Sequence, residues 1–261
     1  MRSIVIGNTS QLSYYFPADY VKISSRDIDE SFICGERWNR VYLCFGESRK
    51  FIGDIGIHED INFGMTIRIV DLLLENSENI IVYSTCELWN KYDGKIDLSM
   101  EYSFYDSPYL QSKHRLSGHI SSDDRYGKVH IMYPFNFNSI HRSSDFLFGK
   151  VFDSIINKNR IEIGDTYFYR DIIHPKHVVK ESMESNSHKI IGSGRLTFVN
   201  DYIRDLYAHY EMDYDQYVSE SSGKYNEYEK RKEYYLNSEK CQYSYKQLLS
   251  DTIEEINLRK K

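Results

Sequence analysis

The chain has 261 residues, of which 41% are hydrophobic and 28% charged, and its formal net charge is −6. A chain of this length can bury a substantial core, as one large domain or as a domain with a smaller lobe. The negative balance leaves no basic stripe for tracking phosphates, which argues against a nucleic-acid-binding role.

The cysteines and the hydropathy of the sequence indicate the cellular compartment of the protein. The cysteines are far apart and form no Cys-x-x-Cys pair, so neither a metal site nor a disulfide framework is expected. We interpret them as reduced thiols; they are Cys34, Cys44, Cys86 and Cys241. The opening "MRSIVIGNTSQ" turns polar too soon for a signal peptide, and no apolar run approaches the roughly 18 residues of a membrane span. We therefore expect a cytoplasmic protein with no membrane partner.

Short apolar runs recur through the first half of the chain. They are SIVIG (3–7), DYVKIS (19–24), RVYLCFG (40–46), NIIVYST (79–85) and KVHIMYP (128–134). Several are almost continuously apolar, which is typical of strands buried on both faces of a parallel sheet. Apolar residues at helical spacing indicate helices between them, at 62–76 and 107–121. This alternation predicts an α/β fold with a doubly wound parallel sheet.

The second half of the chain has two further amphipathic helix candidates, at 144–159 and 197–210. Residues 211–240 are highly charged and rich in tyrosine, which fits either a solvated helical lobe or a cap over a ligand site. We expect a cofactor-binding domain formed by 1–135 with part of 169–210. A smaller, discontinuous substrate-binding lobe would comprise 136–168 and 211–261.

The turn after the first predicted strand, "IGNTSQLS", places Gly7 where a Rossmann fold needs a glycine before the helix N-terminus that receives a pyrophosphate. Ser10 and Ser13 stand where that pattern would have its other two glycines. Arg26, at the end of the second strand, suits the 2′-phosphate of NADP; the alternative is an ordinary surface arginine. Only 18 residues separate Gly7 from Arg26, so the first helix is expected to be truncated.

A tyrosine and a lysine are four residues apart in "SPYLQSKHR", with Tyr109 lying 24 residues after Thr85 of "STCELWN". Positions i and i+4 share one helix face, so Lys113 can approach the Tyr109 hydroxyl. A nearby cation favours the phenolate and so suits Tyr109 to proton exchange. Thr85 could hold the same oxygen by a hydrogen bond.

The segments STCELW and FYDSPYLQSK resemble the extended short-chain dehydrogenase/reductase family, the nucleotide-sugar epimerases and dehydratases. They are most similar to the active-site segments of GDP-mannose 4,6-dehydratases and UDP-glucuronate decarboxylases. The resemblance continues in order through four more segments, which are YPFNFN (133–138), YRDIIHPKHVV (169–179), KIIGSGRLTFVNDYI (189–203) and YSYKQLLSDTIEEI (243–256). Tyr133 stands in place of the usual arginine, and Trp89 and Asn90 in place of the usual Tyr-Gly.

The resemblance implies a Rossmann-like fold with a C-terminal substrate lobe and a catalytic set of Tyr109, Lys113, Thr85 and Glu87. In the dehydratases the matching glutamate removes the proton beside the new ketone, and in the decarboxylases it assists oxidation. The alternative for Glu87 is a solvated loop carboxylate.

The resemblance also implies the ligands and the residues that bind them. NADP or NAD would contact Gly7, Ser10, Gln11, Leu12, Arg26, Tyr109 and Lys113, and the substrate would contact Cys86, Asn136 and Arg170. We expect Cys86 to be a buried, inert thiol, since no histidine flanks it. His174 is expected to satisfy a structural hydrogen bond. The family commonly forms homodimers through the helices predicted at 62–76 and 107–121.

The leading hypothesis is therefore an NAD(P)-dependent enzyme that modifies a nucleotide-activated sugar through C4 oxidation or 4-keto reduction. Dehydration or epimerisation could be coupled to that step. The alternative is a non-catalytic subunit that keeps the fold and has a regulatory or scaffold role, which the altered glycine turn would favour.

Overall fold

The computed structural model describes residues 1–221, 234–236 and 243–260. They form two compact units. The first unit comprises 1–91, 98–134 and 179–191, and the second comprises 92–97, 135–178 and 192–261. Much of the tyrosine-rich stretch 211–240, and Cys241, lie outside the described residues.

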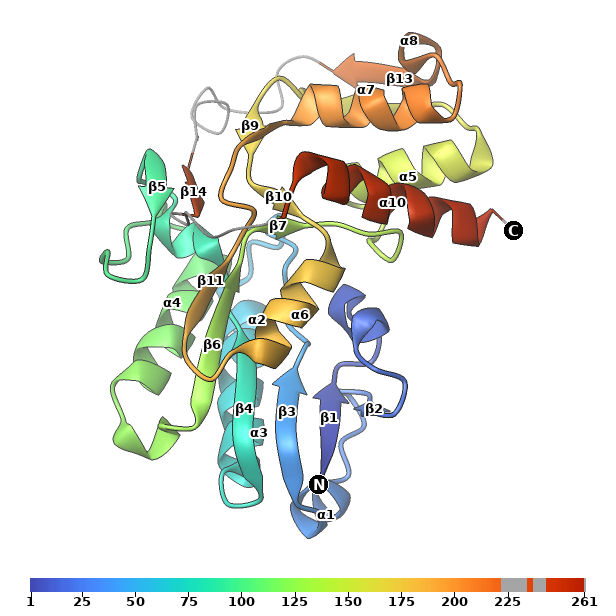
Figure 1. Ribbon diagram of the computed structural model, residues 1–261. Helices are drawn as coiled ribbons and strands as arrows, with labels where there is room; N and C mark the ends of the chain where they lie inside the picture. Colours follow the sequence, from blue (N-terminus) through green and yellow to red (C-terminus); the bar gives the residue numbers. More distant parts are fainter. Residues whose placement is uncertain (222–233, 237–242, 261) are drawn as a thin grey trace. The chain divides into compact units, whose positions relative to one another are not determined.

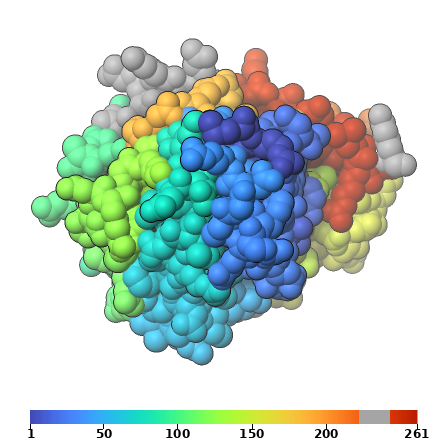
Figure 2. Space-filling view, turned by 90° about the horizontal axis from the view of Figure 1, so that it is seen from below, coloured from blue at the N-terminus to red at the C-terminus, as the bar shows by residue number. Residues whose placement is uncertain are grey.

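The first unit is built on a six-stranded sheet in which every pair of neighbouring strands is parallel (Figure 1). The strands, in spatial order, are β11 (Lys189–Ile191), β6 (Val129–Pro134), β4 (Ser77–Tyr83), β3 (Trp38–Leu43), β1 (Arg2–Ile6) and β2 (Val21–Ile23). Figure 2 shows the blue, cyan and green segments of this unit adjoining one another, in agreement with the strand order. The predicted strands are confirmed.

Burial along the strands shows that both faces of this sheet are covered. Ile4, Val5 and Ile6 follow one another in β1 and are all 0% exposed. Because successive side chains of a strand point to opposite faces, such a run requires covering elements on both sides. The cover includes α3 (Thr66–Leu73) and α4 (Pro108–Ser121) behind the sheet in Figure 1, and the C-terminal part of α6 (Pro175–Glu184) in front. The doubly wound α/β fold predicted from the sequence is confirmed.

Short helical segments complete the first unit. They are η1 (Gln11–Tyr15), α1 (Glu30–Gly35), α2 (Ile55–His58), the π-helix η2 (Glu59–Met65), η3 (Cys86–Trp89) and η4 (Asp124–Tyr126). The connection from β1 to β2 holds only η1, a 3-10 helix of five residues. The first helix is thus truncated, as the short spacing between Gly7 and Arg26 predicted.

The second unit combines helices with small two-stranded sheets. Its helices are α5 (Leu147–Asn157), α7 (Val199–His209), α8 (Tyr214–Tyr217) and α10 (Tyr245–Arg259). Its paired strands are β7 (Asn136–Phe137) with β10 (Ile172–Ile173), β9 (Tyr169–Arg170) with β12 (Thr197–Phe198), β8 (Ile161–Gly164) with β13 (Val218–Ser221), and β5 (Gly94–Ile96) with β14 (Tyr234–Leu236). Helix α10 packs against α5 and α7, where Tyr202 and Thr252 share a buried hydrogen bond of 2.8 Å.

Within the described residues, none of the helices combines the length and apolar character that crossing a membrane requires.

Two histidines lie where β6 meets β11. The Ile131 amide donates to Nδ1 of His188 over 3.0 Å, and His130 Nε2 lies 3.0 Å from Asn79 Oδ1. Burial lowers the pKa of His188, and burial followed by the proximity of His188 and Arg40 lowers that of His130. Folding therefore favours the neutral form of both rings. Their contribution to stability is complete above the unfolded-state pKa of about 6.5 and is lost as the pH falls through the lower folded-state values.

We predict that the free energy of unfolding falls between pH 7 and pH 5, and that His188→Asn reduces this dependence. The asparagine side-chain oxygen can accept the Ile131 hydrogen bond without titrating, so the His188 contribution would be lost, whereas those of His130 and of His141, whose pKa burial also lowers, would remain. Urea unfolding across this pH range measures the effect. Equal pH slopes for the variant and the wild type would contradict the assignment.

Candidate active site

Three segments that follow strands begin at one edge of the first unit, because its strands are parallel. Gly7 follows β1, residues 44–50 follow β3, and residues 84–87 follow β4. The carboxyl ends of the central strands lie at the same edge of the sheet (Figure 1). In open α/β sheets this edge is where ligands bind.

Helix α4 presents both residues of the predicted catalytic pair on its buried face. The Ser107 hydroxyl caps the helix by accepting from the Leu110 amide, and Pro108 occupies the first turn. Tyr109 and Lys113 are 8% and 6% exposed, and they share the buried face with Leu116. The i, i+4 spacing therefore brings both toward the sheet, as predicted.

The Lys113 ammonium is held at the end of β4. Its Nζ donates to the carbonyl oxygen of Tyr83, the last residue of that strand, over 2.9 Å. Burial lowers the pKa of Lys113 to about 8. An ammonium has three donors, and within the described residues Lys113 makes this one hydrogen bond. A polar ligand with hydroxyl acceptors would satisfy the remainder.

Thr85 and Glu87 lie just beyond the same strand end. Thr85 is 7% exposed, and its hydroxyl oxygen accepts the Glu87 amide hydrogen bond over 3.2 Å as the N-cap of η3. The Glu87 carboxylate forms an ion pair with Lys50, from the segment after β3. The role of Glu87 as a base stays a prediction. Sequence analysis missed Lys50, since nothing local marks a lysine 37 residues away as its partner.

A buried asparagine, also missed by sequence analysis, connects the segment after β3 to α4. Asn62 is 0% exposed; its Oδ1 accepts from the Glu47 amide over 2.8 Å, and its Nδ2 donates to the Glu47 carbonyl over 3.0 Å. Nδ2 also donates to Ser112 Oγ over 3.1 Å. Asn62 lies in the π-helix η2, a distortion that often accompanies function. In the sequence Asn62 is only the first residue of the helix predicted at 62–76, a position that carries no signal of burial.

The ring of His58 packs edge-on against Tyr109, with the ring centroids 6.0 Å apart. His58 is 0% exposed, and its Nε2 lies 3.0 Å from the carbonyl oxygen of Ile52, which makes Nε2 the protonated nitrogen. The contact packs the Tyr109 ring against a fully buried side chain.

The turn after β1 differs from the regular nucleotide-binding turn. Gly7 has φ +106°, and a Cβ there would lie 2.8 Å from the Phe45 nitrogen, so both conformation and space require glycine. The Gly7 and Asn8 amides donate to the Ile23 carbonyl, and the Ser10 amide donates to the Gly7 carbonyl. With five residues, η1 offers little of the dipole of a full helix.

The remaining predicted cofactor contacts lie in this turn and beyond β2. Gln11 and Leu12 are 8% and 2% exposed, and Ser10 is half-buried. Arg26 is exposed, and among the described residues its side chain has no hydrogen-bond or ion-pair partner. Their contacts with a cofactor stay a prediction.

The positions that depart from the family pattern form a packed aromatic cluster. Tyr133 and Tyr102 share a hydrogen bond of 2.7 Å, and both rings contact Trp89, whose indole donates to the Met100 carbonyl. Beside Trp89 in the chain, Cys86 is 2% exposed, which fits a buried thiol. Tyr133 thus fills apolar space and carries no charge toward a ligand.

Two predicted substrate contacts and His174 belong to the second unit. Asn136 lies on β7, and Arg170 on β9, where its guanidinium stacks 4.5 Å from the Phe168 ring centroid. Their grouping with Tyr109 stays a prediction. His174 is 0% exposed, and its Nδ1 accepts the Lys176 amide hydrogen bond over 3.2 Å, which fits the structural hydrogen bond expected of it; its Nε2 lies 3.0 Å from the Glu255 carboxylate.

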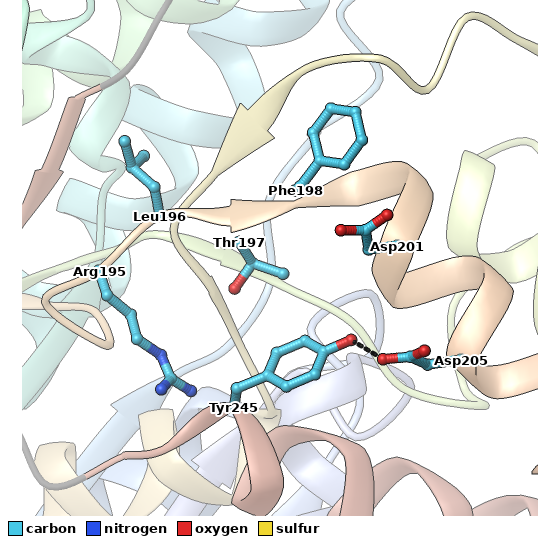
Figure 3. Close-up of a pocket in the computed structure, with 7 residues that line it drawn as sticks. All are labelled: Arg195, Leu196, Thr197, Phe198, Asp201, Asp205 and Tyr245. Atoms are coloured by element: carbon cyan, nitrogen blue, oxygen red, sulfur yellow. Dashed lines mark hydrogen bonds between the residues drawn. The ribbon is translucent and has the colours of Figure 1, made fainter.

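The second unit also has a cavity of about 230 Å³ (Figure 3). It is lined by Arg195, Leu196, Thr197, Phe198, Asp201, Asp205 and Tyr245. The Tyr245 hydroxyl donates to Asp205, one helical turn from Asp201 on α7. None of the predicted site residues lines this cavity.

Comparison with known proteins gives a fold likeness without a sequence match. No family model matches the chain, and no curated protein matches it by sequence. Three solved structures are similar over nearly all of both chains. A UDP-glucose 4-epimerase from Thermotoga maritima with UDP-glucose has TM-score 0.80 at 14% identity and covers 100% of each chain. A dTDP-glucose 4,6-dehydratase from Streptomyces venezuelae with NAD has TM-score 0.78 at 16% identity, and the match covers 98% of this chain and 97% of the other. RMD from Pseudomonas aeruginosa complexed with NADPH has TM-score 0.78 at 13% identity, and the match covers 99% of this chain and 100% of the other.

These likenesses establish the fold: the chain has the Rossmann-like architecture of nucleotide-sugar epimerases and dehydratases. At these identities the activity does not follow from the fold alone.

We predict that Lys113→Met raises the free energy of unfolding at pH 7, on the order of 2 kcal/mol, although it removes a candidate catalytic residue. The folded-state pKa of about 8 lies below the ordinary lysine value of 10.5, so folding favours the neutral amine. This contribution is complete above the unfolded-state pKa and is lost as the pH falls to about 8. Urea unfolding at pH 7 and pH 10 should therefore show a larger difference between the two proteins at pH 7. A variant less stable at pH 7 would contradict this account.

Proposed function

We propose that the chain is an NAD(P)-dependent enzyme that modifies a nucleotide-activated sugar by oxidation at C4 or by reduction of a 4-keto group. In a dehydratase or an epimerase, dehydration or epimerisation is coupled to this step. The observation that carries the proposal is the buried Lys113 ammonium at the carboxyl edge of the sheet, on the same helix face as Tyr109. The support from comparison is that similar folds belong to proteins solved with NAD, NADPH or UDP-glucose.

The residues present fit a nicotinamide dinucleotide best at its nicotinamide-ribose end. There the Lys113 ammonium has donors for ribose hydroxyls, and Gly46 lies beside it; a Cβ at Gly46 would lie 3.5 Å from Nζ and 3.0 Å from Asn62 Oδ1. At the diphosphate end, Gly7 keeps the required turn, and Ser10, Gln11 and Leu12 would supply the remaining contacts. When bound, the nicotinamide supplies the hydride acceptor or donor.

Within this proposal each catalytic residue has a separate task. Tyr109 exchanges a proton with the oxygen on C4, because the positive charge of Lys113 favours its phenolate. Thr85 holds the same oxygen in line. Glu87 provides a carboxylate near C5, which a dehydratase needs as a base and a simple reductase does not.

The substrate-binding part of the proposal assigns Cys86, Asn136 and Arg170 to the nucleotide sugar. In this proposal residues 1–135, with part of 169–210, form the cofactor-binding domain, and residues 136–168 and 211–261 form the substrate-binding lobe. We also propose a cytoplasmic homodimer that pairs through the η2–α3 segment and α4. A non-catalytic scaffold role is the second candidate, favoured by the shortened turn after β1.

The cofactor prediction is that the purified full-length chain binds a nicotinamide dinucleotide, with NADPH bound more tightly than NADH. Arg26, exposed at the end of β2, would contact the 2′-phosphate. Isothermal titration calorimetry with NAD(H) and NADP(H) is the measurement. No binding up to millimolar concentration would favour the scaffold role, and tighter binding of NADH would contradict the role of Arg26.

The catalytic prediction is that Tyr109→Phe lowers turnover roughly 10²–10⁴-fold while cofactor affinity and melting temperature stay near wild type. The substitution removes the hydroxyl but keeps the ring that packs on His58. Chromatography and mass spectrometry of the products from a panel of UDP-, dTDP- and GDP-sugars report turnover, because a coupled dehydration or epimerisation returns the cofactor to its starting redox state. Wild-type rates in the variant would show that the Tyr-x-x-x-Lys spacing is accidental.

A further inference from the structure

The ion pair between Lys50 and Glu87 joins two segments that are far apart in the chain. The Lys50 ammonium contacts both oxygens of the Glu87 carboxylate. The Glu87 side chain is 17% exposed and that of Lys50 is 50% exposed. The carboxylate assigned as a base under the proposed function therefore has a fixed cationic partner, which no part of the family resemblance supplied.

The position of Lys50 follows from contacts deeper in the first unit. Asn62 holds the backbone of Glu47 from both sides through its side-chain amide. The Arg49 guanidinium then closes on the Glu47 carboxylate through two hydrogen bonds, of 3.0 and 2.6 Å. These hydrogen bonds to Arg49 lower the pKa of Glu47. With Glu47 fixed and Arg49 turned back onto it, Lys50 is the next cation along the segment and reaches Glu87.

We propose that Lys50 is a positioning residue that keeps Glu87 ionised and directed from the start of η3. For the role of Glu87 as a base, this inference rests on the proposed function. An opposite charge within about 4–6 Å favours the ionised carboxyl and lowers its titration midpoint by roughly 1–3 units. The Glu87 amide hydrogen bond to Thr85 fixes the backbone end of the residue, and Lys50 fixes the carboxylate end.

The other charged groups near η3 contact partners other than the Glu87 carboxylate. Glu47 and Arg49 pair with each other on the segment that carries Lys50. On α4, Lys113 donates to the Tyr83 carbonyl. Lys91, just after η3, lies over the Tyr105 ring, 5.2 Å from its centroid. Asp106, before α4, accepts from Gln111. Lys50 is thus the cation in contact with the Glu87 carboxylate among these groups.

A positioning role and a purely structural role predict different measurements. An ion pair exposed on the lysine side contributes little to folding stability, typically below about 1 kcal/mol. Removing Lys50 should therefore leave the melting temperature almost unchanged while it shifts the titration of Glu87. If Lys50 had a purely structural role, its removal would lower the melting temperature and leave the titration of Glu87 unchanged.

The test is a ¹³C NMR titration of the full-length protein labelled at the glutamate side-chain carboxyl carbon. The Glu87 signal is assigned by its loss in Glu87→Gln. We expect Lys50→Met to raise the Glu87 titration midpoint by about one unit or more. Lys50→Arg keeps the cation and should retain the wild-type midpoint, and so should the matched control Lys91→Met, which removes a neighbouring lysine.

An unchanged midpoint in Lys50→Met, or an equal shift in Lys91→Met, would overturn the inference. So would a shift accompanied by a large fall in melting temperature, since Lys50 would then act through the fold. The titration needs neither substrate nor cofactor, so its outcome is separate from that of the proposed function, which fails if no dinucleotide binds.

Discussion

The burial of the Lys113 ammonium at the end of β4 is the constraint around which the candidate site is arranged. A cation in this position is costly unless it is hydrogen-bonded, and its pKa of about 8 reflects that cost. Two features of the surrounding residues accommodate the charge. The Tyr83 carbonyl accepts one hydrogen bond, and Gly46 leaves space beside Nζ. A fold that needed only stability would place an apolar side chain here, so the arrangement favours a site that uses the charge.

From Lys113 the same constraint extends to the segment after β3. A Cβ at Gly46 would lie 3.0 Å from Asn62 Oδ1, and Asn62 fixes the next residue, Glu47, by two backbone hydrogen bonds. Because Asn62 also donates to Ser112, beside Lys113 on α4, helix and segment are set by one buried amide. The ion pair of Lys50 with Glu87 lies at the far end of this chain of contacts. The position of a half-exposed lysine thus depends on a fully buried asparagine.

Much of the fold could be predicted from the sequence because local patterns determine it. Ile80, Ile81 and Val82 are buried in succession, and such a run has few alternatives to a central parallel strand. The spacing of Tyr109 and Lys113 likewise fixed a shared helix face. The partners Asn62 and Lys50 could not be found in this way, because their contacts join segments that only the tertiary fold brings together. The short β-pairs of the second unit were also beyond local patterns, since two-residue strands carry almost no periodicity.

The altered glycine turn has a different meaning once the first connection is seen to lack a full helix. In a regular Rossmann turn the third glycine permits close packing of the helix on the strand. Here η1 has five residues, so that packing requirement is relaxed and a side chain at position 13 is tolerated. The Ser13 hydroxyl instead bonds the carbonyls of Asn8 and Ser10, each over 2.7 Å, and closes the turn. Gly7, whose φ and contact with Phe45 do not depend on the helix, is the glycine that remains. The loss of the third glycine therefore follows from the shortened connection, and this loss does not itself count against a functional site at the sheet edge.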